Sequence, residues 1–343
     1  MTLEGAVDGI LFYVTPDFDK LKHIDVWSAA ANQIFYSLGP AFGGLITLSS
    51  YNRFDNNCHR DAILIAFINC GTSVFAGFVV FSIVGFMAFS AGEPVEDVIT
   101  SGPGLAFIAY PDAVSEMPIP QLWSFLFFFM LILLGLDSMF TFVETLTTAI
   151  MDHFNHLHQY KHWVVIGTCF VGFLSGLSMC TNAGIYMFEL LDKTCASWNI
   201  FLFAILELVV VSWIYGVRRF MENIEEMDIN IPIVMKFYWM ACWSLITPIL
   251  LIGLVVISFI QWEPLSSIDY KTYSGEEILY SWPESIQVLG WLVPCSTVAF
   301  IPILAIYNIV SQYKKNGKIG LELFRPTEKW KSVEDKKIEI RFG

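Results

Sequence analysis

The chain has 343 residues, of which 55% are hydrophobic, 16% aromatic and only 15% charged, and its formal net charge is −13. Soluble proteins carry roughly 25% charged residues, so this composition argues against a cytosolic enzyme and favours an all-α integral membrane protein whose surroundings are the lipid bilayer. The negative charge also argues against a nucleic-acid partner, because no basic stripe is present to displace the counterions of a polyanion.

In chain order, the hydropathy predicts a polar extracellular loop, seven transmembrane helices and a charged tail. A helix crosses the bilayer core with about 20 mostly apolar residues, and seven such runs are present between residues 26 and 310. We assign residues 1–25 to the first extracellular loop, residues 89–120 to a long extracellular loop and residues 311–343 to the tail. The predicted spans are residues 26–51, 62–88, 121–150, 163–180, 184–215, 236–261 and 284–310.

The positions of Lys and Arg predict the orientation, because these residues accumulate on the cytoplasmic side of membrane proteins. With the amino terminus outside, 15 of the 19 basic residues fall on cytoplasmic segments, and nine of those are in the tail. We therefore predict an extracellular amino terminus and a cytoplasmic carboxyl terminus. Residues 1–25 do not resemble a signal peptide and read like an interior loop. We accordingly expect the sequence to be truncated at its front.

The first predicted span contains a break at Gly39 and Pro40, followed closely by Gly43. Proline lacks an amide donor and glycine tolerates unwound backbone. Such backbone at membrane depth is acceptable where it lines a cavity or an ion, and discontinuous helices of this kind are typical of secondary transporters. A simple proline kink is the alternative interpretation.

Two pairs of polar residues lie near this break in apolar surroundings. Gln33 and Ser37 in the first span are four residues apart, as are Asn69 and Ser73 in the second, so each pair shares one helix face. Their amide and hydroxyl groups can donate to an anion or present oxygens to a hard cation. Hydrogen bonding between helices is the ordinary role of such residues in membranes and stays open for each pair.

An intramembrane carboxylate marks the third predicted span. Asp137 lies near the middle of an apolar run, where an unpaired charge costs several kcal/mol and therefore indicates a functional site. Leu134, Asp137 and Ser138 share one helix face, so a backbone carbonyl, a carboxylate and a hydroxyl form part of an oxygen cage suited to sodium. A purely structural Asp is the alternative.

Several segments resemble the neurotransmitter:sodium symporter family, from about residue 2 to residue 310. Residues 31–39 resemble the unwound sixth span of the family, and residues 50–54 resemble its cytoplasmic end. Residues 102–107 resemble the fourth outer loop, and residues 136–138 resemble part of the eighth span. The resemblance implies spans six to twelve of an inverted-repeat transporter fold, with the first span unwound in its middle and the first repeat missing.

The resemblance also implies roles for individual residues. Beyond sodium, chloride and the substrate, it implies no cofactor. The implied ligands are Ser37 and Asn69 for one sodium ion; Leu134, Asp137 and Ser138 for a second; Gln33, Ser37, Asn69 and Ser73 for chloride; and Tyr36, Phe42, Ser138 and Met139 for the substrate. The implied gate residues are Tyr51 and Asp152 on the inner side and Asp192 on the outer side.

The function implied by the resemblance is sodium-coupled symport of a small amino acid or neurotransmitter across the plasma membrane. Ser73 favours chloride dependence, because a carboxylate at that position would replace the anion. The second interpretation is a non-transporting chain that associates with full-length carriers, and we expect this chain alone not to catalyse uptake. A seven-pass receptor is the third and least favoured interpretation. The end of the third span, at Met151 and Asp152, argues against it because no Asp-Arg-Tyr-like triplet is present there.

Overall fold

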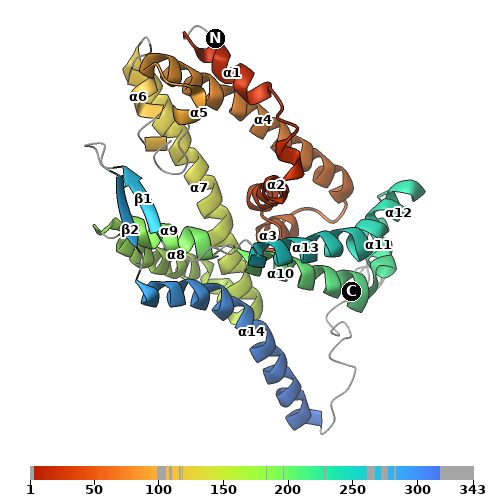
Figure 1. Ribbon diagram of the computed structural model, residues 1–343. Coiled ribbons are helices and arrows are strands. Elements are labelled where there is room, and N and C mark those ends of the chain that lie inside the picture. The colour runs from red at the N-terminus through yellow and green to blue at the C-terminus, as the bar shows by residue number, and fades with distance from the viewer. Residues whose placement is uncertain are drawn as a thin grey trace. The chain divides into compact units, whose positions relative to one another are not determined.

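The computed structural model is mainly helical (Figure 1). It divides into two compact units, residues 1–38 with 58–155 and residues 39–57 with 156–343. The structure describes residues 4–98, 106–107, 110–115, 117, 119–182, 184–195, 197–227, 229–260, 267–271, 277–281 and 283–316. Most of the predicted tail, from residue 317 onward, lies outside the described residues, as do parts of the predicted loop 89–120.

The first unit is built around two long helices, α4 and α7. The short helix α1 packs along α4, and α6 packs against α7. The Tyr110 ring of α6 stacks on Phe127 of α7 with centroids 5.0 Å apart, and burial there raises the pKa of Tyr110 above its ordinary value. The α-helices of this unit are α1 (Ala6–Val14), α2 (Ile24–Leu38), α4 (Cys58–Ala91), α5 (Val95–Val98), α6 (Tyr110–Ser115) and α7 (Pro120–His153).

The second unit is centred on α10 and α13, which pack against each other and bring the rings of Trp198 and Phe259 to 5.2 Å. A buried cluster of Met221, Ile229 and Ile231 fills the turn after α11. The α-helices and strands of this unit are α3 (Gly44–Ser50), α8 (Lys161–Leu177), α9 (Gly184–Cys195), α10 (Trp198–Val209), α11 (Val217–Glu225), α12 (Ile233–Ala241), α13 (Thr247–Ile260), β1 (Ser267–Lys271), β2 (Glu277–Ser281) and α14 (Glu284–Asn316).

Two π-helical segments, Val210–Gly216 and Cys242–Ile246, join α10 to α11 and α12 to α13. The Ser212 hydroxyl donates to the Trp243 carbonyl at 3.0 Å, and the Trp213 indole donates to the Ser244 carbonyl at 3.3 Å. Side chains of one π segment therefore hydrogen-bond carbonyls of the other. In a bilayer, where water is not available to backbone groups, such bonds favour a fixed register between the two helices.

Within the described part of the chain, six helices are long and apolar enough to cross a membrane. They overlap the second to seventh predicted spans and extend beyond several of them, whereas the predicted span 26–51 is divided between the shorter helices α2 and α3. The six candidate spans are Cys58–Ala91, Pro120–His153, Asn155–Cys180, Gly184–Glu225, Ile233–Ile260 and Ile286–Lys314.

The predicted all-α fold class is confirmed, and one short hairpin accompanies the helices. The loop between the last two predicted spans contains an antiparallel pair of strands, β1 and β2, with Ser267 opposite Ser281 and Lys271 opposite Glu277. Both strand sequences place Ile and Tyr at alternate positions, a pattern typical of short strands. A five-residue strand is too short to stand out from a polar loop when hydropathy is read over spans.

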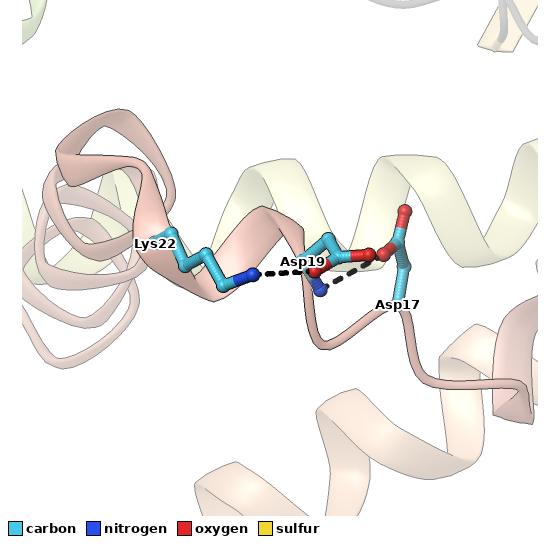
Figure 2. Close-up of polar contacts among 3 residues, drawn as sticks. All are labelled: Asp17, Asp19 and Lys22. Carbon is cyan, nitrogen blue, oxygen red and sulfur yellow. Dashed lines mark hydrogen bonds and ion pairs between the residues drawn. The ribbon is translucent and has the colours of Figure 1, made fainter.

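Residues 15–23 connect α1 to α2 and are called the strap below. Figure 2 shows its central contacts: the Asp19 backbone N–H donates to the Asp17 carboxylate at 3.1 Å, and Lys22 Nζ donates to the Asp19 carboxylate at 2.7 Å. At the two ends, the Thr15 hydroxyl donates to the Leu11 carbonyl at 2.6 Å and the Trp27 indole donates to the Leu21 carbonyl at 3.0 Å. The strap is thus bonded to both neighbouring helices.

Candidate functional site

The break lies at residues 39–43, between the end of α2 at Leu38 and the start of α3 at Gly44. Three residues there have a left-handed backbone: Gly39 (φ +60°), Ala41 (φ +64°) and Gly43 (φ +79°). An L-residue in this region is strained by about 1–2 kcal/mol, whereas glycine is not, so the two glycines make the interruption possible. The boundary between the two compact units falls at the same place, after Leu38.

Within the first unit, a direct contact joins the two predicted pairs of polar residues, one on α2 and one on α4. The Ser37 hydroxyl of α2 donates to the Asn69 side-chain carbonyl of α4 at 2.8 Å. Gln33 lies one turn before Ser37, and Ser73 lies one turn after Asn69, so each extends the same helix face. Hydroxyl and carboxamide oxygens can ligate a cation, and their O–H and N–H groups can donate to an anion.

The three predicted sodium ligands of α7 lie on an uninterrupted helix. The Ser138 hydroxyl is 3.4 Å from the Leu134 carbonyl of its own helix. One turn further on, the Thr141 hydroxyl donates to the Asp137 carbonyl at 3.3 Å. The side chains of Asp137 and Ser138 are exposed in this chain. Thr141 was not singled out from the sequence, although a hydroxyl four residues after Asp137 was the available signal.

The predicted substrate residues are distributed over both units. Tyr36, Ser138 and Met139 belong to the first unit and Phe42 to the second, so the structure places the four residues only within their own units. Tyr36 and Met139 are each more than half exposed, whereas Phe42 is partly buried beside the break. The position of a substrate among them stays a prediction.

The predicted gate residues occupy the ends of three helices. Asp152 lies in the last turn of α7, Asp192 lies near the end of α9, and Tyr51 directly follows α3. Within the second unit, the Lys161 ammonium lies 5.7 Å from the centroid of the Tyr51 ring, a cation–π contact across more than 100 residues of sequence. Lys161 was missed from the sequence, because no local pattern links these two residues.

The amino-acid sequence is similar to a known family and to several curated proteins. The sequence profile of the sodium:neurotransmitter symporter family matches residues 1–312. The sodium- and chloride-dependent glycine transporter 1 of Xenopus laevis is 45% identical over 311 residues, 90% of this chain and 47% of that protein. The sodium- and chloride-dependent neutral and basic amino acid transporter B(0+) of Mus musculus is 43% identical, and that of Homo sapiens 45% identical, each over 96% of this chain and 50% of the relative.

The chain therefore spans about half the length of these curated relatives. The family profile covers all the predicted spans and every predicted site residue. The match therefore extends over the whole predicted membrane region and is not confined to a local motif. The chain belongs to the sodium:neurotransmitter symporter family.

Proposed function

We propose that this chain supplies seven spans, corresponding to six to twelve of the family, to a sodium- and chloride-coupled symporter of a small amino acid. Its relatives include carriers whose names specify dependence on sodium and chloride. The symporter acts in the plasma membrane with the amino terminus of this chain outside and the carboxyl terminus in the cytoplasm. The unwound segment at residues 39–43 makes the first of the seven spans a discontinuous helix.

The hydrogen bond between Ser37 and Asn69 carries this proposal. It brings a hydroxyl from the helix before the break within 2.8 Å of an amide oxygen from α4. Sodium uses Ser37 and Asn69 as oxygen ligands, and chloride uses the donors of the same face, completed by Gln33 and Ser73. Opposite ions at short range stabilise each other where the effective dielectric constant is low. Through these shared ligands, the inward sodium gradient drives the substrate uphill.

The second sodium site uses Leu134, Asp137 and Ser138 of α7. Asp137 stands in the middle of a 34-residue apolar helix and its side chain is exposed in this chain. A carboxylate facing lipid costs several kcal/mol, so this face of α7 needs a polar cover inside the membrane. Spans one to five of the family, on the same polypeptide or on a partner, supply that cover and the remaining ligands.

The substrate is a small amino acid held by Tyr36, Phe42, Ser138 and Met139. Relatives named for glycine and for neutral and basic amino acids support this class. The inner gate uses Tyr51 and Asp152, and the outer gate uses Asp192. The exposed faces of Tyr36 and Met139 are consistent with a pocket completed by further spans.

Complementation tests the proposal. This chain is expressed in oocytes together with spans one to five of the frog glycine transporter, and glycine-evoked current is recorded. We expect a current that requires both polypeptides and disappears when either sodium or chloride is replaced. Absence of current when both polypeptides are present at the cell surface would contradict the proposal, and oocytes that express either polypeptide alone are the matched controls.

The second candidate function is a non-transporting chain that binds complete carriers. The exposed polar face of α7 also favours this possibility, because another family member could cover it. Co-expression with the complete frog transporter distinguishes the two. A change in the surface density of that transporter, unaffected by Asp137→Asn and without complementation of its isolated spans, would favour the association role.

A further inference from the structure

The short helix α1 docks on α4 through backbone-to-backbone contact at glycines. Gly5 and Gly9 are four residues apart on α1 and face Gly85 of α4. A Cβ added at Gly85 would lie 2.6 Å from both the Gly5 carbonyl oxygen and the Gly9 nitrogen. A Cβ added at Gly9 would overlap the Phe81 carbonyl oxygen. The two backbones therefore approach as closely as only glycine permits.

The other end of α1 is held by aromatic packing on the same helix. The Tyr13 ring stacks on Phe81 at 4.8 Å and meets the edge of Phe78 at 5.3 Å. Its hydroxyl lies 3.5 Å from the Val74 carbonyl. Gly5 lies near Phe89 while Tyr13 reaches Val74, so α1 runs antiparallel along α4 and its last contact lies five residues from Asn69.

The strap then returns the chain from α1 to α2 in nine residues. It is bonded to α1 through Thr15 and to α2 through the Trp27 indole, with the Asp17, Asp19 and Lys22 contacts between them (Figure 2). Each exposed contact is weak by itself, so the constraint comes from the short connection rather than from any ion pair. The whole segment from α1 through the strap to α2 is therefore anchored on α4 twice, by the glycines near its start and by Ser37 near its end.

We propose that α1 is a positioning element that sets the separation of Ser37 and Asn69. Docking at Gly9 and Gly85 fixes α1 on α4, and the strap carries this constraint to α2. The consequence for ion binding rests on the proposed function, whereas the positioning itself concerns only this chain. The glycines touch no ligand and act through the two helices that present the site.

Disulfide formation between Ser37→Cys and Asn69→Cys measures that separation directly. The full chain, with its native cysteines replaced by Ala, is placed in lipid nanodiscs and oxidised, and the rate of cross-linking is followed. Adding Gly85→Ala should lower the rate about tenfold, because the added Cβ would meet the α1 backbone and force the two helices apart. Gly71→Ala is the matched control on α4: a Cβ there meets nothing within 4 Å, so the rate should stay at that of the parent.

Circular dichroism and gel filtration show whether Gly85→Ala folds. If it does not, a second variant tests the same constraint. Inserting Gly-Ser-Gly-Ser after Pro16 lengthens the strap and leaves the glycine contact untouched. We expect this insertion to lower the cross-linking rate as well. An unchanged rate in the folded insertion variant, or an equal loss with Gly71→Ala, would overturn the proposal.

An ion-dependent readout separates this inference from the proposed function. In the complementation assay, Gly85→Ala should raise the half-saturating sodium and chloride concentrations severalfold and leave the maximal current at saturating ions unchanged. If the parent chain gives no current, the symport proposal fails while the cross-linking result still decides the role of α1. If the parent transports and the cross-linking rate is insensitive to Gly85→Ala, only the positioning role fails.

Discussion

The discontinuous region α2–α3 and the continuous helix α7 both carry predicted ion ligands, but they expose polar groups in different ways. At residues 39–43 the backbone leaves the helix, with left-handed conformations at Gly39, Ala41 and Gly43. In α7 the backbone stays helical for 34 residues. There, the hydroxyls of Ser138 and Thr141 donate hydrogen bonds to carbonyls of their own helix.

This difference separates two ways in which a helical region can present ligands. The break can offer main-chain carbonyls, because residues outside a helix lack the regular i to i−4 bonds. An unbroken α7 contributes mainly side chains, and Asp137 brings the full negative charge. Changes of charge should therefore have their largest effect in α7, and changes of backbone freedom should have theirs at the break.

Removing the charge of Asp137 in α7 is expected to have the largest effect on sodium affinity. Asp137→Asn keeps the shape and one carbonyl oxygen but loses the attraction to sodium, which is about 4 kcal/mol at ~4 Å for an effective dielectric constant of 20, or roughly a thousandfold in affinity. The sodium dependence of glycine-evoked current in the complementation assay measures this loss. Asp152→Asn, in the last turn of the same helix, is the control and should leave sodium affinity nearly unchanged.

If Asp137→Asn altered the half-saturating sodium concentration only as much as Asp152→Asn, the carboxylate would not be a sodium ligand. The expected electrostatic difference between α7 and the α2–α3 region would then be absent. A structural role for Asp137 would predict instead that the variant lowers the amount of folded chain in the membrane.

Matched glycine substitutions test backbone freedom, with opposite signs expected in the two regions. Gly39→Ala places a Cβ at φ +60° and should destabilise the break by about 1–2 kcal/mol, or roughly tenfold in the population of that conformation. Gly135→Ala lies in regular helix with nothing within 4 Å of the added Cβ, and should stabilise α7 by up to about 1 kcal/mol. Thermal unfolding of the two variants in nanodiscs, followed by tryptophan fluorescence, provides the measurement.

A rise in melting temperature with Gly39→Ala would show that the break is not a populated feature of the folded chain. A fall with Gly135→Ala would show that α7 also departs from regular helix near Asp137. Either result would remove the contrast between the two regions.

The sequence predicted those features that depend on local composition. Long apolar runs located the helices from α4 onward, and Gly39 with Pro40 located the interruption, because both signals act within a few residues. The period of a helix also showed that Gln33 and Ser37 share a face. It could not show that Ser37 meets Asn69, because a face does not identify its partner on another helix.

Features that depend on distant partners were not predictable. Gly5 and Gly9 contact Gly85 across about 80 residues of sequence, and Lys161 lies over Tyr51 across a longer interval. The π segments insert residues into helices without disturbing their apolar composition, so hydropathy does not detect them. The roles of the ion, substrate and gate residues stay predictions, since they require the bound ligands.

Removing one hydroxyl from each region gives the smallest expected effect and the sharpest comparison. Ser37→Ala removes a hydrogen bond between helices, worth about 1 kcal/mol, whereas Ser138→Ala removes only a bond within its own helix, which the 3.4 Å separation makes weak. If both hydroxyls ligate sodium, both variants should raise its half-saturating concentration about fivefold for about 1 kcal/mol each. Only Ser37→Ala should also lower thermal stability.

The double variant Ser37→Ala with Asn69→Ala isolates the bond between the helices. A coupling free energy of about 1 kcal/mol in thermal stability is expected for this contacting pair, and none for Ser138→Ala with Asn69→Ala. Equal coupling in the two pairs would mean that the stability loss reflects a general loosening of the unit. A coupling confined to Ser37 and Asn69 would instead show that the broken span depends on α4 for its position, while α7 holds its ligands through its own helix.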